Sequence, residues 1–192
     1  VFKLNPRIFD ILTILLSALI WQHFAEKRRP AVLLAYVPMA ALFINLHGAL
    51  WPLPFAVPFL GMVLQRGLSK KERLVVFGVL CLMLAATFLN PYGLDMHLYI
   101  IRSMGVISNM GIVEMRAPRA IDRGGMAGIA LIVFLTLYIY TRAKSGRLRE
   151  INRMWLVILL GAIFVTLLQE RNYSLLLPCV IVFMGSVDLS SR

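Results

Sequence analysis

The stretch "ALFINLHGALWPLPF", residues 41–55, decides how this chain folds, because polar groups stand at the centre of an otherwise apolar run. Asn45, His47 and Gly48 interrupt the apolar sequence. A soluble protein can bury such groups beside other polar groups, whereas a membrane protein tolerates them only where they face protein or a water-filled cavity. The meaning of these residues therefore depends on whether the chain lies in a membrane.

The composition of the whole chain is that of a membrane protein. Of its 192 residues, 60% are hydrophobic and the mean hydropathy is +0.81, against about 45–50% apolar residues in ordinary globular domains. The formal net charge of +11 comes from basic clusters between apolar blocks. Those clusters form no stripe with interleaved aromatic residues, which argues against nucleic acid as a partner.

Seven apolar blocks predict an all-α, polytopic bundle of about seven transmembrane spans. Each block is too continuous and too rich in Leu, Ile, Val and Phe for an ordinary surface helix. The expected blocks are Ile8–Ala25, Ala31–His47, Trp51–Gln65, Leu74–Asn90, Met126–Thr141, Met154–Gln169 and Tyr173–Val187.

Three strongly basic connections predict the orientation of these spans. They read "EKRRP" at 26–30, "RGLSKKER" at 66–73 and "TRAKSGRLREINR" at 141–153. Short loops dense in Lys and Arg stay in the cytoplasm, and two spans separate each basic connection from the next. One orientation therefore suits all three, with residues 1–7 and the connections near 48, 90–125 and 170 outside. The external amino terminus leads us to expect that residues 1–192 are one transmembrane domain, the carboxy-terminal part of a longer protein.

Two hairpins are too short to cross the membrane fully twice. The 35 residues between Pro30 and Arg66 span about 52 Å as a helix, whereas two crossings of the hydrocarbon core need about 60 Å. The pair Met154–Val187, with "QERN" at its tip, is similarly short. We therefore expect an outward-facing polar cavity at the depth of the outer leaflet. Prolines 52, 54 and 58 fit this expectation because they distort the start of the third block.

The external segment 90–125 predicts a helix that lies in the membrane interface. Leu94, Leu98 and Ile101 share one side of a helical wheel, and the other side carries Asp95, Tyr99, Arg102 and Ser103. The turn signal Asn-Pro-Tyr-Gly at 90–93 would end the fourth span and start this helix. His97 falls on the apolar side, so we expect it to pack against the bundle.

Several polar residues leave two interpretations open. Asn45 and His47 either bridge neighbouring helices through hydrogen bonds or face a ligand, and a pairing between them requires the helix to end there. Glu114 and Arg116 form an exposed ion pair or a site, and Glu170 and Arg171 either neutralise each other in a buried turn or bind phosphate. Neither a metal site nor a Ser-His-Asp set is visible, no cofactor is expected, and Cys81 and Cys179 are expected to be small core residues.

Four short motifs resemble the recurring pattern of an uncharacterised family of bacterial multi-pass membrane proteins. They are "INLHG" at 44–48, "LNPYG" at 89–93, "VEMRAP" at 113–118 and "ERNYSLLLP" at 170–178. That family is similar in architecture to the GT-C glycosyltransferases, which take sugars from polyprenyl-phosphate carriers at the outer face of the membrane. The resemblance implies a protein of the bacterial inner membrane whose partner is a membrane lipid, a polyprenyl-phosphate sugar. GT-C enzymes carry their catalytic carboxylates in the first external loop, which we expect outside residues 1–192.

Two functions follow as alternatives. In the first, the chain is the membrane portion of a GT-C-like glycosyltransferase, in which arginines clamp a lipid phosphate and the other polar residues shape the cavity. In the second, it is a non-enzymatic transporter or assembly scaffold with the same outward-facing cavity. The expected substrate-binding residues are Asn45, His47, Asn90, Tyr92, Arg102, Glu114, Arg116, Glu170, Arg171 and Asn172.

Overall fold

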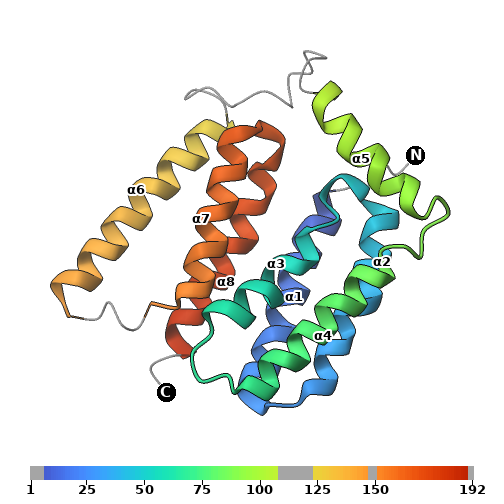
Figure 1. Ribbon diagram of the computed structural model, residues 1–192. Helices are drawn as coiled ribbons and strands as arrows, with labels where there is room; N and C mark the ends of the chain where they lie inside the picture. Colours follow the sequence, from blue (N-terminus) through green and yellow to red (C-terminus); the bar gives the residue numbers. More distant parts are fainter. Residues whose placement is uncertain (1–6, 108–122, 147–150, 190–192) are drawn as a thin grey trace. The chain divides into compact units, whose positions relative to one another are not determined.

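The structure is a computed structural model that describes residues 7–107, 123–146 and 151–189 (Figure 1). Within these ranges it is all-α and contains no strand, which confirms the all-α part of the expected fold class. The side chains of residues 49, 104–107, 123, 124, 170, 171 and 187–189 lie outside the description. The chain divides into two compact units, Val1–Gly105 (unit 1) and Val106–Arg192 (unit 2). Each unit is described by itself below.

Unit 1 holds the first four predicted apolar blocks and the predicted interfacial helix, and all five are helical. The 3₁₀-helix η1 runs directly into α2, and a second 3₁₀ turn, η2, joins α2 to α3. The elements are α1 (Arg7–Lys27), η1 (Pro30–Ala35), α2 (Tyr36–Leu46), η2 (Gly48–Leu50), α3 (Leu53–Leu64), α4 (Lys70–Ala86) and α5 (Leu94–Ile107).

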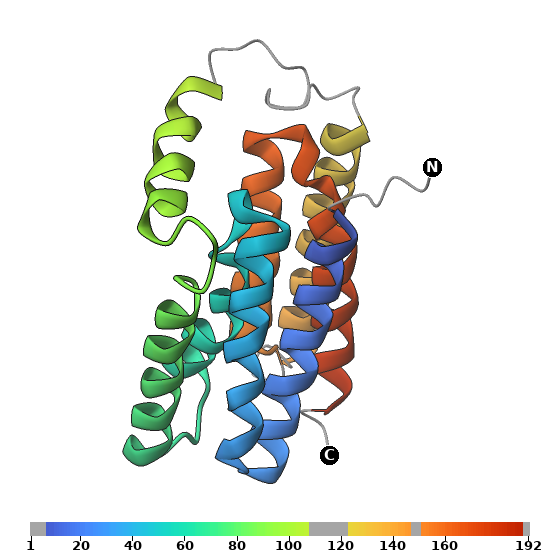
Figure 2. The same ribbon diagram turned by 90° about the vertical axis from the view of Figure 1, so that its right-hand side faces the viewer.

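The helices of unit 1 pack side by side, and each helix from α1 to α4 runs antiparallel to the one before it, so the contacting pairs α1–α3 and α2–α4 are parallel. Contacts join α1 to α3, α2 to α4 and α3 to α4, and Figure 2 shows α1 beside α2. Trp21, Phe24, Leu33, Tyr36 and Ile44 are among the fully buried side chains. The hydroxyl of Tyr36 donates to the carbonyl oxygen of Ser17 at 2.7 Å. The phenol thus keeps a hydrogen-bond partner in an apolar interior, as a buried polar group must.

The two basic connections of unit 1 lie at the same end of the helices. Arg28 Nη1 lies 3.2 Å from Glu72 Oε1, which joins the α1–η1 connection to the start of α4. Ser69 and Glu72 form a capping box at that start: the Ser69 hydroxyl accepts from the Glu72 amide, and the Glu72 carboxylate accepts from the Ser69 amide. Two connections that the sequence placed on one side of the membrane are therefore adjacent in space.

Unit 2 contains the last three predicted blocks. It consists of α6 (Arg123–Lys144), α7 (Arg153–Leu168), η5 (Glu170–Leu175) and α8 (Leu176–Leu189), with α7 in contact with both α6 and α8. The side chain of Asn152 accepts from the amides of Met154 and Trp155 and so caps the start of α7. Leu159 and Phe183 are fully buried where α7 meets α8.

In the part of the chain that the structure describes, two helices are long and apolar enough to cross a membrane, namely α1 and residues Gly125–Lys144 of α6. A buried core helix of a soluble protein or a signal sequence meets the same criterion of length and composition. The helices α2, α3, α4, α7 and α8 have 11, 12, 17, 16 and 14 residues, fewer than the about 20 that a full crossing needs. The prediction of helical blocks is confirmed, whereas about seven spans stays a proposal.

Candidate functional site

A carboxylate and an imidazole meet at the end of unit 1 opposite its basic connections. The helix α2 ends at Leu46, and His47 leaves the helical conformation with φ −144° and ψ 63°. Its ring turns toward α1, where Nδ1 lies 2.6 Å from Oδ1 of Asp10. The side chain of Asp10 is 3% exposed and that of His47 is 18% exposed. The helix therefore ends at the position that the sequence marked, and its last polar side chain contacts a buried acid.

This geometry determines which nitrogen of His47 can act. With Asp10 ionised, its carboxylate only accepts hydrogen bonds, and the proton between the two groups is then carried by Nδ1 of His47. The second nitrogen, Nε2, has no hydrogen-bond partner among the described residues. In the neutral ring Nε2 is an acceptor, and in the imidazolium it is a second donor. Asp10 thus orients a group that can accept a proton or bind an anion.

Asp10 was missed by the sequence analysis. It is the only acid in the block Ile8–Ala25, and a lone acid inside an apolar span is the signal that would have found it. It also begins a buried polar stripe on α1, because Thr13 and Ser17 lie on the same helix face and are equally buried. Ser17 Oγ lies 3.9 Å from the sulfur of Met39 on α2. The stripe faces the other helices of unit 1.

Asn45 bridges two helices, as one of its two interpretations predicts. Its Nδ2 donates to the carbonyl oxygen of Ala41 at 2.7 Å and to that of Leu89 at 3.1 Å. The second bond ties α2 to the chain just after α4. Asn45 and His47 therefore contact different partners, and the pairing that a broken helix would have allowed does not form.

The side chain of Asn90 makes its hydrogen bonds within the turn between α4 and α5. Its Nδ2 donates to the carbonyl oxygens of Thr87 at 2.9 Å and Gly93 at 3.1 Å, and its Oδ1 accepts from the amide of Tyr92 at 2.9 Å. Gly93 adopts φ 52°, a left-handed conformation that glycine reaches without steric cost. The predicted turn is confirmed, and Asn90 shapes backbone rather than a cavity. The Tyr92 side chain is 69% exposed.

The helix α5 packs through an aromatic and histidine face. His97 is buried, its Nε2 lies 3.0 Å from Thr87 Oγ1, and its ring centroid lies 5.3 Å from that of Trp51 and 4.8 Å from that of Phe88. The expectation that His97 packs against the bundle is confirmed. Its buried neighbour on this face is Ile100. The wheel correctly grouped Leu94, Leu98 and Ile101, but these three are exposed.

The remaining site residues divide into three groups. Arg102 is exposed on α5. Asn172 is buried in unit 2, where its Nδ2 donates to the carbonyl oxygen of Val165 at 3.0 Å and its own carbonyl accepts from Thr166 Oγ1 at 3.2 Å. Asn172 therefore closes the end of α7. The backbones of Glu170 and Arg171 belong to η5, but their side chains, like residues Glu114 and Arg116, lie outside what the structure describes.

The two cysteines have different environments. Cys179 is buried, as expected of a small core residue, whereas Cys81 is exposed, so the expectation was wrong there. The reason is that Cys81 lies on the surface of α4 that faces a groove beside α3. Across the described residues, no three His, Cys, Asp or Glu side chains gather closely enough to hold a metal ion.

Comparison with known proteins adds no relative on which to base a function. No protein-family model, no curated protein and no solved structure matches this chain.

Proposed function

We propose that this chain is a multi-pass protein of the bacterial inner membrane, with about seven spans, and the membrane portion of a GT-C-like glycosyltransferase. It would use a lipid-phosphate-linked sugar at the outer face of the membrane. The observation that carries the proposal is the Asp10–His47 pair, which presents one imidazole nitrogen at the end of unit 1 away from its basic connections.

The apolar surface of the helices supports membrane insertion. Leu12, Leu16 and Leu19 are exposed along α1, and further large apolar side chains are exposed along α4 and α6. Soluble monomers rarely expose contiguous apolar patches of more than a few hundred Å². Lipid is the solvent in which such surfaces are stable. The shorter helices then belong to hairpins whose tips lie below the outer surface, as the span lengths predict.

The charge distribution supports an outer location for the Asp10–His47 pair. Arg28 and Glu72 join the two basic connections at one end of unit 1, and basic connections remain in the cytoplasm. His47 follows α2 at the opposite end. Ionisable groups are costly to bury within a membrane. They are therefore rare there, and those that occur usually belong to a functional site. A carrier whose phosphate reaches the outer leaflet would meet His47 there.

His47 has the chemistry to bind a phosphate. Asp10 accepts the Nδ1 proton, so a protonated ring donates from Nε2 to a phosphate oxygen as a charge-assisted hydrogen bond. The exposed side chains of Tyr92 and Arg102 belong to the same unit and supply a phenol and a guanidinium for the headgroup. The catalytic carboxylates belong to the external loop that the resemblance places outside residues 1–192.

A scaffold or transporter is the second candidate, and the asparagines favour it. The side-chain Nδ2 atoms of three asparagines donate hydrogen bonds to backbone carbonyl oxygens. They are Asn45, Asn90 and Asn172. They therefore stabilise helix ends. A scaffold that holds partner proteins needs stable helix ends, but it does not need a lipid phosphate bound at His47.

Binding of a polyprenyl phosphate separates the two candidates. Purified protein in detergent would be titrated with a polyprenyl phosphate and, in a parallel arm, with the corresponding polyprenol. We expect His47→Gln to weaken phosphate binding at least tenfold and to leave polyprenol binding unchanged. His23→Gln is the matched control, because His23 is exposed near the opposite end of α1. Equal binding of both lipids by all three proteins would remove the glycosyltransferase proposal and favour the scaffold, and thermal melting would show that each variant is folded.

A further inference from the structure

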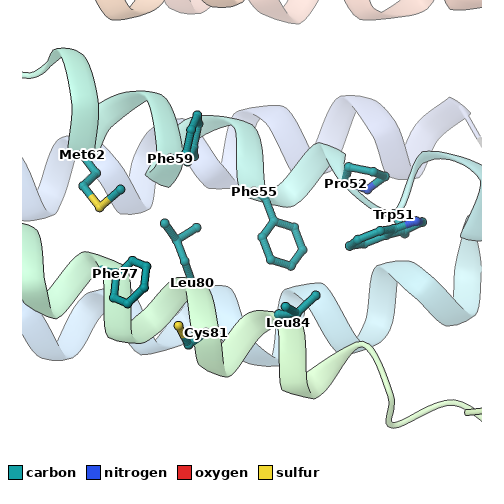
Figure 3. A pocket seen from close by; sticks show the side chains of 9 residues that line it. All are labelled: Trp51, Pro52, Phe55, Phe59, Met62, Phe77, Leu80, Cys81 and Leu84. Atoms are coloured by element: carbon teal, nitrogen blue, oxygen red, sulfur yellow. The ribbon is translucent and has the colours of Figure 1, made fainter. Parts of the chain in front are cut away.

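An apolar groove of about 430 Å³ runs along the surface of unit 1 between α3 and α4 (Figure 3). Its lining carries no charged side chain. Trp51, Phe55 and Met62 form one wall, and Phe77, Cys81 and Leu84 form the other. Met62 and Phe77 lie at one end of the groove in Figure 3, and Trp51 lies at the other.

The size of the groove fits one lipid tail. Eleven residue steps separate Trp51 from Met62, which is about 16 Å at the helical rise, and one leaflet contributes about half of the 30 Å hydrocarbon core. Both walls are apolar along this length. The groove is therefore matched in length to a single lipid tail of one leaflet.

The end of the groove at Met62 and Phe77 is basic. The connection after α3 carries Arg66, and α4 begins with Lys70, and both side chains are exposed. Lys70, Phe77, Cys81 and Leu84 follow one another at helical spacings of 7, 4 and 3 residues, so they share the face of α4 that borders the groove. Among the described residues neither Arg66 nor Lys70 has an ion-pair partner.

A third cation near this end, Arg73, already has hydrogen-bond partners within unit 1. Arg73 lies on the same side of α4, but its guanidinium donates to the carbonyl oxygens of Met62 and Gln65. These are carbonyls at the end of α3, which would otherwise lack partners. Arg73 thus holds the two helices together at the basic end, and Arg66 and Lys70 remain for an anion.

We infer that the groove binds one acyl chain of an anionic phospholipid from the cytoplasmic leaflet, with its phosphate at Arg66 and Lys70 and its tail end toward Trp51. The charge at one end selects the anionic headgroup, and the apolar walls accept the tail. The inference rests on the proposed membrane orientation but not on glycosyl transfer, since the site lies at the opposite end of unit 1 from His47.

Trp51 makes the orientation of the bound tail measurable. Tryptophan fluorescence of the purified protein in detergent would be titrated with phosphatidylglycerol brominated near the tail end or near the carbonyl, and with the same two forms of phosphatidylcholine. Trp51→Phe gives the background from Trp21 and Trp155, which are buried. We expect the tail-end bromines on phosphatidylglycerol to quench most strongly. Phosphatidylcholine, whose choline cation offsets the charge of its phosphate and is repelled by Arg66 and Lys70, should need more lipid, up to on the order of 25-fold at about fivefold per cation.

Charge variants test the headgroup site. Arg66→Gln and Lys70→Gln should each weaken quenching by phosphatidylglycerol about fivefold. Lys71→Gln is the matched control, since Lys71 is exposed but lies about 100° around α4 from Lys70, and it should have no effect. Bound phosphatidylglycerol should also slow modification of Cys81 by N-ethylmaleimide. Thermal melting of each variant shows whether it is folded.

Three results would overturn the inference. Stronger quenching by bromines near the carbonyl would show that the headgroup lies toward Trp51. The bound lipid would then belong to the outer leaflet. Equal quenching by both phospholipids would mean ordinary solvation by lipid. Absence of quenching by any of them, with Cys81 protected in lipid-free detergent, would mean that protein covers the groove. None of these results bears on binding of a polyprenyl phosphate by His47, so this inference and the proposed function fail separately.

Discussion

The carboxylate of Asp10 lies 2.6 Å from Nδ1 of His47, and the two residues are 37 positions apart in the chain. The contact joins the first turn of α1 to the residue at which α2 ends. It therefore sets the position of the hairpin tip against α1 and decides which ring nitrogen of His47 is presented.

Removing one member of this pair should be more damaging than removing both. His47→Leu leaves a buried carboxylate without its partner and is expected to lower the free energy of unfolding by about 3 kcal/mol. The double variant Asp10→Leu with His47→Leu should recover most of that loss, because an apolar pair replaces a buried ionisable pair. Unfolding in mixed detergent micelles measures both. Additive losses from Asp10→Leu and His47→Leu made singly would show that the residues are not coupled, and Asp95→Leu, at an exposed position of α5, serves as the control.

Gly61 should be intolerant of a methyl group. A Cβ placed on Gly61 would lie 2.1 Å from Cζ2 of the Trp21 ring, so α1 and α3 can approach only because this position has no side chain. Gly61→Ala is expected to destabilise unit 1 by about 1–3 kcal/mol through overpacking. Gly78→Ala is the matched control on α4, where a Cβ meets nothing within 4 Å, and it should be neutral or slightly stabilising. Equal melting temperatures for the two variants would contradict the packing described for α1 and α3.

The capping box of α4 should make stability depend on acid pH. Hydrogen bonds from the backbone and side chain of Ser69 lower the pKa of Glu72, and Arg28 adds a smaller effect in the same direction. Because the folded pKa is lower than the unfolded one, the ionised carboxylate stabilises the protein fully above the unfolded pKa of about 4.3, and that contribution is lost as pH falls through the folded pKa. The melting temperature of the native protein should therefore exceed that of Glu72→Gln at pH 6, and the difference should shrink below pH 4.5. A constant difference from pH 6 to pH 3 would mean that the charge of Glu72 has no part in it.

The local pattern of the sequence predicted the helices well, because each depends on neighbours along the chain. Apolar continuity located the seven blocks, and Asn90 with Gly93 specified the turn before α5 by hydrogen bonds over three residues. The end of α2 at His47 could also be predicted, since polar residues and Gly48 interrupt the apolar run at that point.

The contacts between helices could not be predicted in the same way. Asp10 has no local signature beyond being an acid in an apolar block, and its partner becomes visible only when α1 and α2 lie together. Cys81 was assigned to the core because its block is apolar, yet α4 also exposes large apolar side chains such as Leu74 and Phe77, so an apolar block alone does not place a residue in the core. The same reason explains α5, whose Leu98 and Ile101 are exposed while His97 packs inside.

Cysteine labelling in intact cells tests the outward placement of the Asp10–His47 end most directly. Single cysteines would be placed at Tyr92, after α4 at that end, and at Ser69 and Ser145 in the basic connections, with Cys81 and Cys179 replaced by Ala. These three positions are exposed in the structure. A membrane-impermeant maleimide added outside should label the cysteine at position 92, and those at positions 69 and 145 should react only after the membrane is permeabilised. Labelling at 69 and 145 but not at 92 would place His47 on the cytoplasmic side and contradict a carrier site at the outer face.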